Sequence, residues 1–131
     1  MEWLFEWLLS IYLPQKLIEM KIENKGHTSI IEIETSTACK NIVNELGQRM
    51  AEDLEAQNIV INLLERTQVS IEDLQVFLPL SQAHNERSQS FVLVSNSVNH
   101  NDVPAELHVV PTLQEAQDII DMEEIERDLG F

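Results

Sequence analysis

Near its middle the chain reads Asn58-Ile-Val-Ile-Asn-Leu-Leu64, a run that is almost continuously apolar and rich in β-branched residues. Such a run is typical of a strand that is buried on both faces of a parallel sheet. Val69-Ser-Ile-Glu-Asp-Leu74 then looks like a helix start, because Ser70 can cap it and its first and last residues are spaced for a hydrophobic staple. The chain returns as Phe91-Val-Leu-Val94, a second buried strand. We therefore predict a strand–helix–strand crossover between parallel strands.

Apolar periodicity and turn residues predict the elements on both sides of this unit. In chain order they are a hairpin over 20–33, a helix over 39–54, a strand over 58–64, a helix from 71 that resumes through 82–87, a strand over 91–94, a loop over 95–104, a short strand over 107–110 and a helix from 113. The order is β-β-α-β-α-β-(β)-α. The fold class is therefore α/β, a single domain with a mixed, mostly parallel sheet and helices packed on it.

Proline and glycine set expectations for the two later helices. Pro79 removes a backbone hydrogen bond from the central helix, so we expect a kink or break near Leu78. Thr112 and Glu115 match a capping box at the start of the last helix. The apolar pattern of that helix runs on through Ile125 and Leu129. Gly130 then suits a left-handed stop, after which Phe131 can fold back on Ile125.

The chain is strongly acidic, with 8 Lys and Arg against 23 Asp and Glu in 131 residues and a net charge of −15. This charge repels phosphate backbones and anionic lipid, so we expect neither a nucleic-acid partner nor stable membrane insertion. It suits a protein partner with a basic surface, or it serves solubility alone. Cys39 is the only cysteine and is expected in the core, so we predict a cytoplasmic protein without disulfides. The three glycines are isolated and form no phosphate loop, and no cofactor is expected.

Residues 1–19 differ from the rest of the chain, since they hold both tryptophans and the only tyrosine. Glu2 and Glu6 interrupt the segment, which is too short to span a bilayer. One interpretation is that translation begins at Met20 and that 1–19 is not native. A second is an amphipathic helix that docks on the domain, 20–131, or on a second copy. A third is an interfacial anchor, which the acidic residues disfavour.

From Ile59 to Ile120 the chain resembles a STAS domain, the fold of bacterial anti-sigma factor antagonists and of the cytoplasmic tails of sulfate transporters. The resemblance is carried by the strand Ile59-Val-Ile-Asn-Leu63, by Ser70-Ile-Glu-Asp73 at the position of the family's Asp-Ser-Ser-Gly motif, and by Pro111-Thr-Leu-Gln-Glu-Ala116. It implies a regulatory domain that works through protein–protein contacts. The candidate interaction site is Ser70, Ile71, Glu72 and Asp73.

This sequence departs from the family at the phosphorylated serine, where Glu72 stands, and at the serine before it, where Ile71 stands. The family's phosphoswitch therefore does not carry over. One hypothesis is that Glu72 supplies a permanent negative charge at a helix N-terminus. The alternative is that Glu72 and Asp73 are favourable first-turn residues. Ser70 remains a candidate phosphosite, although a capping role already engages its oxygen.

The stretch Met122-Glu-Glu-Ile-Glu-Arg-Asp-Leu-Gly-Phe131 resembles small bacterial STAS-like proteins, several of which are labelled ribonuclease Z. That enzyme family binds metal through a clustered His-x-His-x-Asp-His motif. Here no two of the four histidines, His27, His84, His100 and His108, are closer than eight positions. We expect no metal site and no ribonuclease activity. Each histidine is expected at the surface or in a loop, with His108 half-buried.

Gln117, Asp121, Glu124 and Asp128 share one side of the last helix. They form either a solvated surface or an acidic docking face for a basic partner. We therefore predict a non-enzymatic protein-interaction or regulatory module of STAS type. The alternatives are an RNA-processing protein or accessory, and a self-associating module, such as a homodimer, that pairs through 1–19 or an exposed sheet edge.

Overall fold

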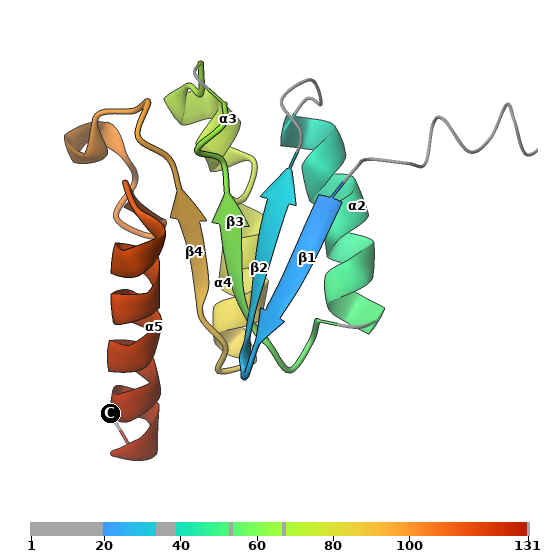
Figure 1. The fold of residues 1–131 in the computed structure, drawn as a ribbon, viewed down its shortest axis with the longest axis vertical. Helices are drawn as coiled ribbons and strands as arrows, with labels where there is room; N and C mark the ends of the chain where they lie inside the picture. Colours follow the sequence, from blue (N-terminus) through green and yellow to red (C-terminus); the bar gives the residue numbers. More distant parts are fainter. Residues whose placement is uncertain (1–19, 34–38, 53, 67, 131) are drawn as a thin grey trace, which may run out of the picture.

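The structure, a computed structural model, describes residues 20–33, 39–52, 54–66 and 68–130. The elements are β1 (Met20–Lys25), β2 (Thr28–Ile33), α2 (Cys39–Glu52), β3 (Asn58–Asn62), α3 (Ile71–Gln75), α4 (Leu78–Glu86), β4 (Phe91–Val94), the 3-10 turn η1 (His100–Asp102), β5 (His108–Val110) and α5 (Leu113–Asp128). Their order confirms the predicted succession of strands and helices (Figure 1). The expectations for residues 1–19 and for Phe131 lie outside the described residues.

The five strands form one sheet in the order β1-β2-β3-β4-β5. β1 and β2 pair as the predicted antiparallel hairpin, and each later strand is parallel to its neighbour. Ile31, Ile61, Leu93 and Val109 lie opposite one another in register across four strands. The predicted α/β class with a mixed, mostly parallel sheet is therefore confirmed.

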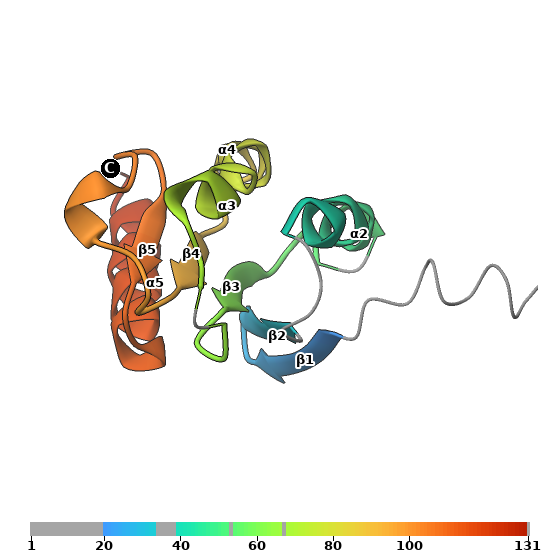
Figure 2. The ribbon, with the colours of Figure 1, turned by 90° about the horizontal axis from the view of Figure 1, so that it is seen from above.

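Helices cover the two faces of the sheet unequally, with α2, α3 and α4 on one face and α5 alone on the other (Figure 2). Ile59 and Ile61 of β3 belong to the core under the three helices, whereas Val60 packs with Ala116 and Ile120 of α5. Successive side chains of a strand point to opposite faces, so β3 must be apolar at successive positions. This is why the run beginning at Asn58 is almost continuously apolar.

The start of α3 has the predicted caps. Ser70 Oγ accepts a hydrogen bond from the Asp73 backbone N–H at 3.1 Å, and an Asp73 carboxylate oxygen accepts one from the Ser70 N–H at 3.1 Å. Val69 and Leu74 are both buried in the same core cluster. The capping box and the buried pair hold the chain as it turns back from β3 into the helix.

The predicted break near Leu78 is also confirmed. α3 ends at Gln75, and α4 begins at Leu78 with Pro79 in its first turn. Proline is tolerated there because the first backbone N–H groups of a helix have no partner within it. Phe77, between the two helices, is fully buried.

Several element bounds differ from the predicted ones. β3 ends at Asn62 rather than Leu64, because Asn62 Oδ1 accepts the Leu64 backbone N–H at 3.0 Å and turns the chain. α2 ends at Glu52, where the prediction ran to 54, and β5 begins at His108, where the prediction began at 107. The loop after β4 contains the 3-10 turn η1. Asn99 Oδ1 caps this turn by accepting the Asn101 backbone N–H at 3.0 Å.

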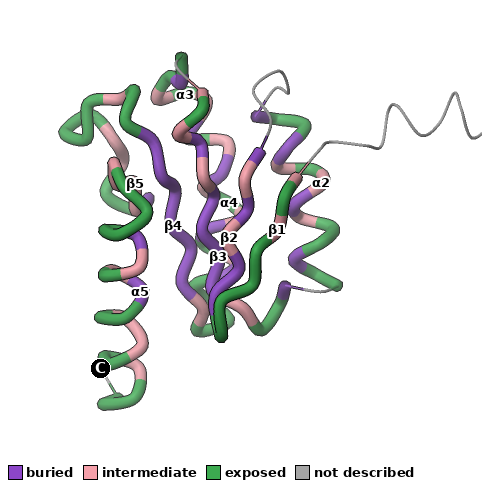
Figure 3. The backbone as a smooth tube through the Cα atoms, in the orientation of Figure 1, coloured by how far each residue is buried: buried purple, intermediate pink, exposed green. Residues whose placement is uncertain are grey.

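The last helix begins at the predicted cap, Thr112, although only the Thr112 half of the predicted capping box is formed, and it ends at the predicted glycine. Thr112 Oγ1 accepts the Glu115 backbone N–H at 3.1 Å, and Gly130 has a left-handed φ of 80°. The predicted continuation of its apolar pattern is wrong, however, because Ile125 and Leu129 face solvent. Figure 3 shows that α5 is exposed along much of its length, whereas β3 and β4 are buried.

Candidate functional site

The segment that resembles the STAS motif lies at the carboxyl end of β3, where parallel sheets commonly place binding sites (Figure 1). The Val69 N–H donates to Ser97 Oγ at 3.3 Å, which ties this segment to the loop after β4. Ser70 and Glu72 are exposed, while Ile71 and Asp73 are half-buried. Because Ser70 Oγ and the Asp73 carboxylate cap α3, both residues have a structural role here.

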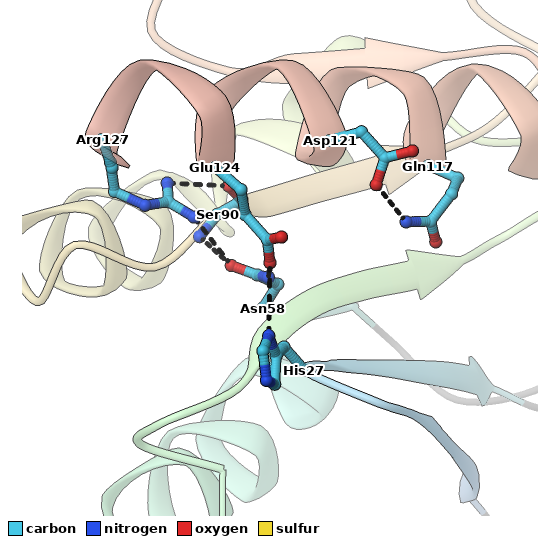
Figure 4. Close-up of polar contacts among 7 residues, drawn as sticks. All are labelled: His27, Asn58, Ser90, Gln117, Asp121, Glu124 and Arg127. Carbon is cyan, nitrogen blue, oxygen red and sulfur yellow. Dashed lines mark hydrogen bonds and ion pairs between the residues drawn. The ribbon is translucent and has the colours of Figure 1, made fainter. Parts of the chain in front are cut away.

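A polar cluster joins the opposite end of the sheet to α5 (Figure 4). Asn58 is 1% exposed and donates from Nδ2 to Glu124 Oε1 at 2.7 Å. Its Oδ1 accepts the Ser90 backbone N–H at 2.9 Å and Arg127 Nη2 at 3.3 Å. Arg127 Nη1 also donates to Ser90 Oγ at 3.1 Å. We call Asn58, Ser90, Glu124 and Arg127 the polar clamp.

The polar clamp fixes the helix rather than presenting free groups. A hollow of about 370 Å³ lies beside it, lined in part by His27, Glu124, Arg127 and Asp128. His27 Nδ1 is 4.0 Å from Glu124 Oε1. The amide of Asn58 is already bonded through both its oxygen and its nitrogen, and the guanidinium of Arg127 is bonded to two clamp residues. The arrangement therefore positions α5 on the sheet.

The residues of the predicted acidic face of α5 differ in their contacts and exposure. Glu124 points to Asn58 and belongs to the polar clamp. Gln117 Nε2 donates to Asp121 Oδ1 at 2.8 Å, one turn further along the same side (Figure 4). Asp121 and Asp128 are exposed. Only part of the predicted face is therefore open to a partner.

The sequence prediction missed an exposed apolar surface on the outer side of α5. Four large hydrophobic side chains are exposed among the described residues: Leu113, Met122 and Ile125 of α5, and Leu129, which caps its C-terminal end. The last three are 61%, 58% and 66% exposed. At about 100° per residue they lie in a sector of about 60°, on the side away from the sheet. We call Met122, Ile125 and Leu129 the apolar stripe.

Carboxylates border the apolar stripe. Asp121 and Asp128 lie on one side of it and Glu126 on the other, and all three are exposed. Within the described residues the ion pairs join Lys25 to Glu23 and His27 to Glu124, so no described ion pair neutralises these carboxylates. An apolar surface with a polar border is the usual composition of a protein-binding site.

The sequence did contain a signal for the apolar stripe. α5 has apolar residues on two sides. Ala116 and Ile120 lie on the buried side, and Met122 and Ile125 lie on the exposed side. A helix that packs on one sheet face needs a single apolar side. The second apolar side indicates a second contact, but the pattern alone does not say which side the sheet covers.

The four histidines lie in different parts of the fold. Among the described residues no group of three or more His, Cys, Asp or Glu side chains is placed to hold a metal ion. His27 and His100 are exposed and His108 is half-buried, as predicted. His84 contradicts the prediction, because it is fully buried and its Nε2–H donates to the Gln57 carbonyl. Burial lowers its pKa, and the charge of Arg87 adds to this, while the bond to the Gln57 carbonyl opposes it.

Cys39 is buried at the start of α2, as predicted for a core residue. Its pKa is raised, first because burial disfavours the thiolate. A thiol with a raised pKa is a poor nucleophile at neutral pH. Cys39 therefore packs in the core.

Comparison with models of known protein families finds none that matches this chain, and comparison with curated proteins finds none similar to it. Within the part of the chain that the structure describes, the helices are too short or too polar to cross a bilayer.

Proposed function

We propose that this chain is a non-enzymatic protein-interaction domain of STAS type that works in the cytoplasm as a regulatory module. The observation that carries the proposal is the apolar stripe, because the exposed large hydrophobic side chains among the described residues all belong to α5 or its C-cap. Exposed apolar residues are normally scattered over a surface. Three of the four, Met122, Ile125 and Leu129, share the outer side of α5, and this concentration favours a surface that a partner covers.

The energy available from this surface supports a real interaction. Fully burying a Met, Ile or Leu side chain is worth about 1.5–3 kcal/mol. At the exposed fractions of Met122, Ile125 and Leu129, covering each would give about 1–2 kcal/mol. The polar clamp adds rigidity, because it holds α5 on the sheet before a partner binds. A surface that is already ordered loses little conformational entropy on binding.

Residues that resemble the STAS motif support the proposed type of domain. They lie at the start of α3, at the carboxyl end of the sheet, while the apolar stripe lies on α5. We assign the partner contact to α5, because Ser70 and Asp73 are engaged in capping their own helix. Glu72 is then a favourable first-turn residue.

The test captures partners with the full tagged chain from a lysate of its own cells. The stripe variant is Met122→Gln with Ile125→Gln, which removes apolar surface and keeps helix propensity. The matched control is Asn41→Gln with Asn44→Gln, at exposed positions of α2. We expect a protein that the wild type and the control retain and the stripe variant loses. Retention of the same proteins by all three chains, or of none by the wild type, would contradict the proposal.

A further inference from the structure

We propose that the apolar stripe pairs with an amphipathic helix of a partner protein, and that this partner helix carries Lys or Arg on both sides of its own apolar seam. The inference rests on the proposed interaction function and specifies the partner. It follows from the spacing of the stripe, from the charges beside it and from the way α5 is held.

The stripe has the spacing of a coiled-coil seam. Met122, Ile125 and Leu129 are separated by three and then four residues, which is the a-d-a pattern of a heptad. They extend over about 10 Å of helix, or two turns. One heptad earlier the same positions hold Glu115 and Asp118, so the seam is confined to the second half of α5. A surface of this shape fits another helix better than an extended strand.

The positions beside the seam are all acidic. With Met122 at position a, Asp121 and Asp128 occupy position g and Glu126 occupies position e. In paired helices the e and g residues of one helix face those of the other and select the partner. α5 has seven acidic residues, and its one basic residue, Arg127, is bound in the polar clamp. A complementary helix therefore has basic e and g residues.

The same charges argue against a second copy of the chain as the occupant. Pairing α5 with itself would bring Asp121, Glu126 and Asp128 against their own equivalents, and like charges at these positions are repulsive. Each copy also carries a net charge of −15. The chain's own residues 1–19 fit less well than a basic helix, since they contain Glu2, Glu6 and Glu19 against Lys16.

The approach to the stripe is open. The last turns of α5 extend past the ends of the strands (Figure 1), and the helix is exposed there (Figure 3). On the inner side, Glu124 and Arg127 are bonded to Asn58, which fixes the rotation of the helix and keeps the seam directed outward. A partner helix can lie along α5 without displacing any described element.

The test uses three synthetic peptides of about three heptads. The basic peptide has Leu at a and d and Lys at e and g; the acidic peptide replaces those Lys with Glu; the scrambled peptide has the basic composition without the seam. Each is labelled and titrated with the full chain, its stripe variant (Met122→Gln, Ile125→Gln) and the α2 control (Asn41→Gln, Asn44→Gln). Fluorescence anisotropy gives the affinity at about 50 mM and about 500 mM salt.

We expect the full chain and the α2 control to bind the basic peptide, with an affinity that falls about tenfold or more at the higher salt. The stripe variant should bind it about tenfold more weakly, and the acidic peptide should not bind. Equal binding of the scrambled peptide would overturn the inference, because attraction would then need no seam. No binding of the basic peptide, or a wild-type dimer in sedimentation that the stripe variant loses, would overturn it as well.

The experiments distinguish a failure of the interaction function from a failure of the basic-helix inference. If lysate capture depends on the stripe but the basic peptide does not bind, the interaction function stands and the basic helix is wrong. If the peptide binds as expected but the wild type captures nothing from lysate, the interaction function is wrong while the surface chemistry stands.

Discussion

Asn58, the first residue of β3, donates a 2.7 Å hydrogen bond to Glu124 in the second half of α5, 66 positions later. The oxygen of the same amide accepts the buried Ser90 N–H, directly before β4. One side chain therefore joins two strands and the helix that carries the proposed binding surface. Its removal should loosen α5 from the sheet.

Replacing Asn58 with Ala should lower the free energy of unfolding by about 1–3 kcal/mol. The variant leaves the buried Ser90 N–H without its acceptor, and a buried donor without a partner is costly. Urea unfolding followed by circular dichroism measures the loss. Asn44→Ala, at an exposed position of α2, is the control and should change stability little or raise it slightly. Equal stability of the two variants would show that the polar clamp contributes nothing.

His84 should make the fold sensitive to mild acid. Its pKa is lowered by burial, so between its ordinary value of about 6.5 and its lower folded value the unfolded chain binds a proton that the folded chain does not. Stability is therefore complete above about pH 6.5 and falls below it, by up to about 1.4 kcal/mol per pH unit.

The control for this pH dependence is His84→Gln, which keeps a donor for the Gln57 carbonyl and does not titrate. Carboxylates affect both chains equally, so the difference in unfolding free energy between them isolates the histidine. We expect the wild type to lose more stability than His84→Gln between about pH 7.5 and about pH 5.5. Parallel curves would mean that His84 titrates normally.

Pro79→Ala should lower stability by about 0.4–1 kcal/mol. In the first turn of α4 proline breaks no hydrogen bond, and its ring restricts the unfolded chain. A proline inside a continuous helix behaves oppositely, since its replacement by Ala gains about 3 kcal/mol. The sign of the change in urea unfolding therefore tests whether α3 and α4 are separate helices.

Much of the fold follows from local pattern. The apolar run from Asn58 predicts β3 because a strand covered on both faces must be apolar at successive positions. Ser70 and Asp73 predict the start of α3, and Pro79 predicts the break before α4, because caps and proline act through neighbouring backbone groups. These features need no knowledge of distant contacts.

The candidate site was less predictable because it depends on contacts between distant residues. The burial of His84 requires the Gln57 carbonyl, 27 positions away. Glu124 looked like one member of an acidic face, yet it bonds to Asn58. The choice between two apolar sides of α5 is made by Val60 and Val92, which pack with Ala116 and Ile120 and leave Met122 and Ile125 outside.

Oxidative footprinting of the full chain, free and bound to a protein retained from lysate, tests the central claim most directly. We expect Met122 and Leu129 to become protected on binding, while Ile71 at the start of α3 reacts as in the free chain. Met50, which is buried, serves as the internal reference. Protection of the α3 start with unchanged oxidation of Met122 would contradict the account and would move the binding surface to the segment that resembles the STAS motif.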